Sequence, residues 1–238
     1  PNVSINSGTP NSPLTRVDLS PDNFPIGGTI NQYLIIGLMS GTYTVGAGGN
    51  YTTLTEAIND LNSKYLSGPV HFSLIDNSYP SETFPIAINA NAYSSETNTI
   101  TIKPAAGKTP VFSGSSTNSA IFKLNGVDNL TIDGSNQSNG ADRSMTIANT
   151  YLGTVAGIWL VGKTAGTGCN NVTIKNCVIT TGSNSGSYYY GISVSSDNIG
   201  VAGFDNDNIT IYNNDISKCT YGIYAVGSSS GVYNRSEE

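Results

Sequence analysis

Charged residues are scarce in this chain, and the scarcity restricts its partners. Only 11% of the 238 residues are Asp, Glu, Lys or Arg, less than half of the usual share. The 10 basic residues are outnumbered by 16 acidic ones, so the net charge is −6. With no basic stripe to neutralise phosphates, nucleic acid and anionic membrane surfaces are excluded as expected partners. Gly, Asn, Ser and Thr replace the charges, and such residues suit strands stacked in register.

Long hydrophobic runs and an even set of cysteines are also missing. No apolar segment approaches the roughly 20 residues that span a bilayer, so we expect no membrane span. Cys169 and Cys177 bracket one expected strand, about 25 Å apart in extended chain, which is too far for a disulfide. With Cys219 they make an odd count, and we expect three thiols. A Cys177–Cys219 bridge between strands is the alternative.

The first 40 residues differ from the remainder of the chain. They contain five prolines, separated by short apolar segments: Pro1, Pro10, Pro13, Pro21 and Pro25. This pattern predicts an extended N-terminal segment or the end of a preceding domain. Residues 41–238 then form a second unit, which opens with a strand over 41–46 and a glycine-rich turn.

One helix is predicted, over residues 54–62. Thr53 and Glu56 have the spacing of a capping box, in which each side chain bonds a free backbone N–H of the other residue. Apolar residues follow on one face, at Leu54, Ala57, Ile58 and Leu61. A single amphipathic helix before a series of strands can cover the open end of a stack.

The remainder of the chain carries a repeat, and the repeat determines the expected fold. Four similar segments are centred on threonines spaced by 30, 42 and 37 residues: Thr101, Thr131, Thr173 and Thr210. A second set of Gly-Ile pairs alternates with the last three of these segments, at Gly157, Gly191 and Gly222. A third strand is expected at 145–147 and 178–180. Three short strands per period predict an all-β, right-handed parallel β-helix with one short N-terminal capping helix.

The alternation of residues along these strands predicts which faces lie inward. The aliphatic residues flanking each threonine should point inward, and the threonines outward. Two positions after the threonines stand Lys103, Asp133 and Lys175. Successive coils lie roughly 4.8 Å apart, so Asp133 should lie between two lysines. Asn129, Asn171 and Asn208 should form a stacked column at a turn, where Asn adopts the left-handed conformation.

These segments resemble the right-handed β-helix, or pectin-lyase-like, superfamily. The residues that carry the resemblance are 41–61 (GTYTVGAGGNYTTLTEAINDL), 67–72 and 98–102, and it extends over roughly residues 41–233. Similar modules occur in large secreted bacterial surface proteins. The resemblance implies the fold, and an extracellular or cell-surface location, but not an activity, because the superfamily includes lyases, hydrolases, esterases, adhesins and phage tailspikes. Neither the pectate lyase calcium cluster nor the polygalacturonase set of three aspartates matches here.

Two groups of acidic residues are candidates for chemistry. Asp133, Asp142 and Arg143 could act on a sugar as paired carboxylates with a cation, or could belong to the lysine ladder and a solvated loop. Asp205 and Asp207 place carboxylates at alternate positions, as at the start of a calcium loop. Turn chemistry before a strand accounts equally well for that pattern, so the expected cofactor is none, with calcium as the alternative.

Aromatic residues give the candidate ligand site. Tyr190 and Tyr221 each precede a Gly-Ile pair, so they should stack on adjacent coils. Trp159 should extend the same surface because it faces opposite to Ile158. Such a row can bind the apolar faces of sugar rings, or it can be a ladder that stiffens the coil. His71, the one histidine, alternates with core residues and reads as an ordinary exposed strand residue.

The sequence therefore favours a non-catalytic structural or adhesive module of a secreted or surface protein. A polysaccharide-binding or polysaccharide-degrading β-helix is the alternative, and a trimeric tailspike-like fibre is a third hypothesis. Expected partners are polysaccharides or other cell-surface components. Because no capping helix follows the last strand, at 222–226, we also expect further coils or another subunit to cover that end.

Overall fold

The computed structural model describes residues 3–5, 17–19, 37–182 and 188–227. Most of the N-terminal 40-residue segment lies outside these ranges. Within it, β1 (Val3–Ile5) pairs antiparallel with β2 (Val17–Leu19). The strand expected at 41–46 begins three residues earlier than predicted, as part of β3 (Leu38–Val45).

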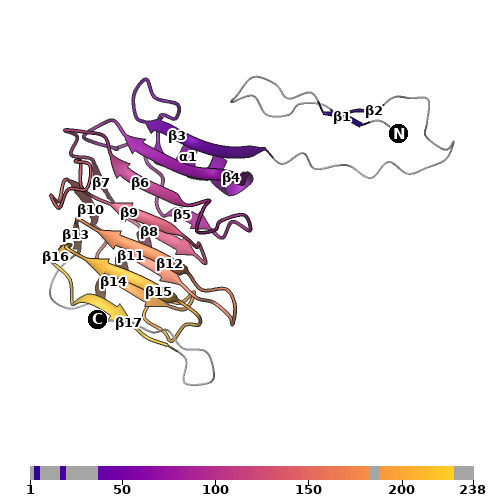
Figure 1. The fold of residues 1–238 in the computed structure, drawn as a ribbon. Coiled ribbons are helices and arrows are strands. Elements are labelled where there is room, and N and C mark those ends of the chain that lie inside the picture. The colour runs from indigo at the N-terminus through magenta and orange to yellow at the C-terminus, as the bar shows by residue number, and fades with distance from the viewer. Residues whose placement is uncertain (1–2, 6–16, 20–36, 183–187, 228–238) are drawn as a thin grey trace.

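Three parallel sheets make up the remainder of the described chain (Figure 1). The six-stranded sheet contains β3, β4 (Tyr65–Leu74), β6 (Ile100–Pro104), β9 (Leu130–Asp133), β12 (Asn170–Lys175) and β15 (Asp207–Tyr212). The four-stranded sheet contains β7 (Val111–Gly114), β10 (Met145–Asn149), β13 (Cys177–Thr181) and β16 (Asp215–Ser217). The five-stranded sheet contains β5 (Ile86–Asn89), β8 (Ala120–Asn125), β11 (Val155–Val161), β14 (Tyr189–Ser195) and β17 (Tyr221–Ala225).

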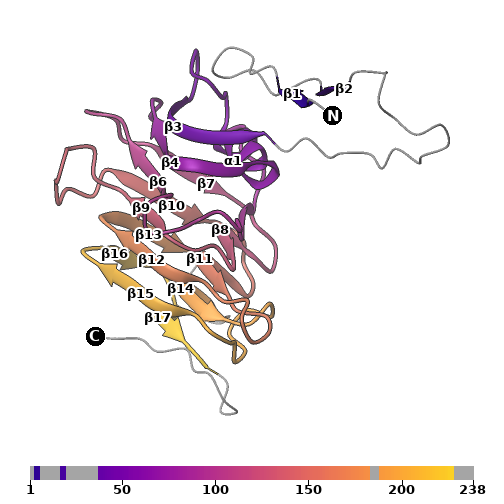
Figure 2. The ribbon, with the colours of Figure 1, turned by 45° about the vertical axis from the view of Figure 1, so that its right-hand side comes forward.

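From β6 onward the chain visits the sheets in a fixed order: six-stranded, four-stranded, then five-stranded. From β8 onward, each strand pairs in parallel with the strand one coil earlier, so the coils stack in sequence order (Figures 1 and 2). The molecule is a right-handed parallel β-helix with three strands per coil, as the sequence predicts.

The core is a stack of aliphatic columns inside the coils. Ile100, Leu130 and Val172 occupy one column and are fully buried, and each lies beside its counterpart in the next coil. The threonines between them, Thr101 and Thr131, stay partly exposed on the outer face. Burial of each such aliphatic side chain contributes about 1.5–3 kcal/mol, so the repeat itself supplies most of the cohesion between coils.

Helix α1 (Leu54–Ser63) covers the N-terminal end of the five-stranded sheet. Its capping box forms as predicted, and its four apolar residues are buried. On the edge strand β5, Asn62 Nδ2 donates to Ala87 O (2.8 Å) and Asn89 N donates to Asn62 Oδ1 (3.0 Å). One amide side chain thus takes the place of the missing neighbouring strand, and the expected capping role is confirmed.

The predicted asparagine column is also confirmed. Asn129, Asn171 and Asn208 all have positive φ, of 53°, 54° and 52°. Asn171 Nδ2 donates to Asn129 Oδ1 (3.3 Å), and Asn208 Nδ2 donates to Asn171 Oδ1 (3.1 Å). The column therefore links three coils at the same turn.

All three cysteines are free thiols, as the sequence suggests. Burial raises the pKa of Cys169 to about 12 and that of Cys177 further still. The buried thiols are therefore unreactive packing residues.

The last described coil is less covered than the coils before it. Ile223 is 50% exposed, whereas Ile192, its partner in the preceding coil, is completely buried. Residues 228–238 lie outside the described part of the chain, so coverage of this end by further coils or another subunit stays a prediction. No described helix is long and apolar enough to cross a membrane.

Candidate functional site

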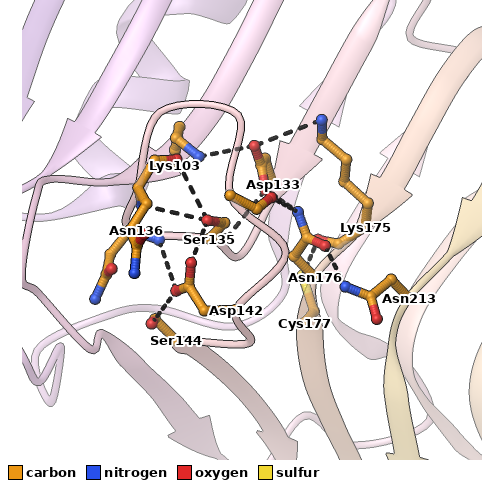
Figure 3. A network of polar contacts seen from close by, with 12 residues as sticks. Lys103, Asp133, Ser135, Asn136, Asp142, Ser144, Lys175, Asn176, Cys177 and Asn213 are labelled. Carbon is orange, nitrogen blue, oxygen red and sulfur yellow. Dashed lines mark hydrogen bonds and ion pairs between the residues drawn. The ribbon is translucent and has the colours of Figure 1, made fainter.

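The first candidate group surrounds Asp133, and its lysine ladder forms as predicted (Figure 3). Lys103 Nζ lies 2.8 Å from Asp133 Oδ2, and Lys175 Nζ lies 3.6 Å from the same oxygen. Asp133 is only 7% exposed. It is therefore a buried carboxylate that joins three coils, which we call the Asp133 joint, and not an open surface carboxylate.

The second oxygen of Asp133 is occupied as well. Asn176 Nδ2 donates to Asp133 Oδ1 (2.7 Å), and so does the backbone N–H of Ser135 (3.0 Å). Burial by itself would raise the pKa of Asp133, but the hydrogen bonds from Lys103, Asn176 and Ser135 outweigh it and hold the pKa below its usual value. The group is thus an ionised carboxylate at neutral pH.

Asp142 closes the loop that follows β9 (Figure 3). Its carboxylate accepts hydrogen bonds from Ser135 Oγ (2.5 Å), Ser144 Oγ (2.5 Å) and the backbone N–H of Asn136 (3.1 Å). Slight burial by itself would raise the pKa of Asp142, but the hydrogen bonds from these donors outweigh it and lower the pKa to about 2. The carboxylate therefore stabilises the conformation of the loop to which it belongs.

Arg143 points elsewhere. Its Nε donates to Asn213 O (2.8 Å) and its Nη2 to Asn213 Oδ1 (2.6 Å). A general acid on a sugar needs a raised carboxyl pKa, and Asp133 and Asp142 both have lowered ones. A catalytic role for the three residues stays an untested hypothesis, and the contacts they make are structural.

The second candidate group is a set of tyrosines on the five-stranded sheet, which we call the tyrosine platform: Tyr188, Tyr190, Tyr221 and Tyr224. Tyr190 and Tyr221 are paired across adjacent coils, as predicted. The rings of Tyr188 and Tyr221 are nearly parallel, at 6° with centroids 6.5 Å apart. Tyr190 lies 5.4 Å from Tyr221 at 16°, and Tyr224 contacts both of them at 5.2 Å.

A glycine puts Tyr190 on the outer face. Simple alternation would place Tyr190 and Ile192 on the same side, but the strand register omits Gly191 between them. A Cβ on Gly191 would lie 2.2 Å from Ile216 Cγ2 and 2.5 Å from Gly222 O. Only glycine fits there. Ile192 consequently joins the inner core, and Tyr190 joins a separate outer cluster.

The platform has exposed and buried members. Tyr188 is 58% exposed and Tyr221 38%, whereas Tyr190 is only 5% exposed. The expectation that Tyr190 belongs to an exposed row is therefore wrong. Burial, and after it the neighbouring tyrosines, raises the pKa of Tyr190. Ile199, on the loop after β14, packs in the same outer cluster, and the ring of Tyr190 stacks with both exposed rings, those of Tyr188 and Tyr221.

Trp159 is also not part of an open surface, contrary to expectation. It is only 3% exposed and donates from Nε1 to Ser195 Oγ (2.9 Å). Ser195 Oγ also accepts from the backbone N–H of Gly200 (3.2 Å), so the loop is fixed over the indole. Lys123 Nζ lies 4.5 Å from the centre of the Trp159 ring, a cation–π contact.

The candidate calcium residues lie at the start of β15. Asp205 is 7% exposed, and its Oδ2 accepts a hydrogen bond from the backbone N–H of Gly166. Asp207 is half-buried and pairs with Asn170 in the ladder. Among the described residues, no three His, Cys, Asp or Glu side chains are grouped to hold a metal ion. Calcium binding stays the alternative to the expectation of no cofactor.

Two features of these sites are not among those predicted from the sequence. One is a second asparagine column, in which Asn213 Nδ2 donates to Asn176 Oδ1 (2.7 Å). The signal was present, since an Asn directly follows both Lys175 and Tyr212. The other is the loop over Trp159, for which the sequence carries no periodic signal.

Fold and surface together define a parallel β-helix of the kind that the sequence resembles, with an aromatic patch on one outer face. No protein-family model and no curated protein matches the chain. Among solved structures it matches the pectin methylesterase from Aspergillus niger in deglycosylated form, at 14% identity and a TM-score of 0.34. The match covers 82% of this chain and 88% of that chain.

Proposed function

We propose that this chain is a polysaccharide-binding β-helix of a secreted or surface-exposed protein, and that the tyrosine platform contacts the sugar. The observation that carries the proposal is the pair of exposed, nearly parallel rings of Tyr188 and Tyr221. The C–H face of a pyranose ring packs against such rings, and the phenol hydroxyls add hydrogen bonds.

The less exposed members of the platform, buried Tyr190 and partly buried Tyr224, support this reading. Tyr190 and Tyr224 fill the space beneath and beside Tyr221. Rings held in place by packing lose little conformational freedom when a ligand binds, so more of the contact energy remains as affinity. A polymer can also contact neighbouring coils at once, which adds to weak individual contacts.

The carboxylates of Asp133 and Asp142 favour binding of the polysaccharide without turnover. Asp133 and Asp142 are held in structural hydrogen bonds with lowered pKa values. A purely structural or adhesive module is the second candidate, and it is favoured by the charge and asparagine ladders, whose contacts join coil to coil.

A glycan array tests the proposal, with wild type, Tyr221→Ala and a matched control, Tyr93→Ala. Tyr93 is 50% exposed and packs on Tyr65 at 4.2 Å, away from the platform. We expect binding by wild type and Tyr93→Ala, and its loss in Tyr221→Ala. Absence of binding to every glycan would favour the structural module.

A further inference from the structure

The outer face of the five-stranded sheet is almost free of charge. Two of its outward columns run in register from coil to coil and contain the tyrosines and Trp159. One contains Ala87, Lys123, Trp159, Ser193 and Tyr224, and the other contains Ala120, Ala156, Tyr190 and Tyr221. Lys123 is the one charged residue of these nine, and its ammonium lies over the ring of Trp159.

Lys123 is also distant from the exposed rings. Its strand, β8, lies two coils from β14, which Tyr188 precedes, and three coils from β17, which contains Tyr221. At the usual spacing of strands these separations correspond to roughly 10 and 14 Å along the stack, so the ammonium group of Lys123 is not an immediate neighbour of either exposed ring.

Most other described cations are engaged elsewhere. Lys103 and Lys175 pair with Asp133, and Arg143 with Asn213. Two further lysines have carboxylate partners, Lys64 with Asp60 and Lys163 with Asp197. Lys218 is the lysine closest in sequence to the platform, three residues before Tyr221.

A carboxylate-bearing sugar would meet unfavourable surroundings on this face. The faces of aromatic rings carry negative potential, so they repel an anion that lies against them. A carboxylate that loses water there without a cationic partner is strongly destabilised. The net charge of −6 opposes the approach of a polyanion as well. A neutral pyranose meets none of these costs.

We propose that the tyrosine platform selects neutral polysaccharides and rejects polyuronates. The inference rests on the proposed function, since it assigns a substrate class to that same surface. Selectivity arises because Lys123, engaged over Trp159, is the one cation of these two columns among the described residues, and because the net charge of the protein is negative.

A matched pair of ligands tests the inference: one polyuronate in fully methyl-esterified form and the same polymer after saponification. The two differ in charge while the sugar backbone is kept. Affinity electrophoresis with both forms, and with neutral glucans and xylans, should give binding to uncharged polymers. Retardation by the saponified form should be at least tenfold weaker at low salt.

Each outcome is distinct. Equal or tighter binding of the saponified form would overturn the inference and leave the proposed function standing. Loss of that binding in Lys218→Gln would then identify the cation responsible. Binding of no polymer at all would reject both proposals. Tyr221→Ala serves as the control that the retardation arises at the platform.

Discussion

At the scale of single residues, the Asp133 joint makes the clearest energetic prediction. Asp133→Ala leaves Lys103 and Lys175 without their shared partner and removes the shorter of the two hydrogen bonds that Asn176 Nδ2 donates. We expect a loss of about 1–3 kcal/mol in the free energy of unfolding, measured by urea denaturation. Asp197→Ala is the matched control, since its pair with Lys163 is largely exposed and should contribute about 0–1 kcal/mol. Equal effects would contradict the account.

Asp142 makes a prediction about pH. Its pKa is about 2 in the folded protein, below the roughly 3.9 of an unfolded chain. A lowered folded pKa gives stability that is present above the unfolded value and is lost as pH falls toward the folded one. Wild type should therefore lose stability between about pH 4 and pH 2 more steeply than Asp142→Asn. Parallel pH profiles of the unfolding midpoint for the two proteins would refute this.

At the scale of elements, one side chain of the capping helix, Asn62, makes its hydrogen bonds to the edge strand β5. Asn62→Ala removes both hydrogen bonds to β5 and should cost about 1–3 kcal/mol. Asn59→Ala, on the exposed face of the same helix, should leave stability nearly unchanged. Hydrogen exchange at the amide of Asn89 should accelerate only in the first variant, and protection that survives there would count against the capping role.

The sequence predicted elements whose pattern is periodic and local. Thr53 and Glu56 specify the helix start, and the threonine and asparagine columns specify strand register, because each residue has a counterpart one coil away. Exposure at the platform could not be predicted in the same way. The strand register places Tyr190 and Trp159 on the outer face of the sheet. Both are nevertheless buried, in a cluster with Ile199 from a loop that does not repeat from coil to coil. The hydrogen bonds of Asp142 could not be predicted either, because their donors, Ser135 and Ser144, do not belong to the repeat.

At the scale of the whole molecule, the stack should lose stability unevenly toward its C-terminal end. Ile192 and Ile223 occupy the same inward column, one buried and one half exposed. Ile192→Ala should cost about 2–5 kcal/mol in the free energy of unfolding, and Ile223→Ala clearly less. If both substitutions cost the same, the last described coil is covered, either by the remainder of the chain or by a second copy. Light scattering on the same samples distinguishes these two and tests the trimeric fibre as well.

The most direct test of the polysaccharide-binding account is an equilibrium titration of the best glycan ligand against wild type and a Tyr188→Ala/Tyr221→Ala double variant. Both substitutions remove exposed rings and leave the buried Tyr190 in place, so circular dichroism should report an unchanged fold. The account predicts an affinity at least tenfold weaker in the double variant, about 1.4 kcal/mol. An unchanged affinity would place sugar binding elsewhere and contradict the role of the tyrosine platform.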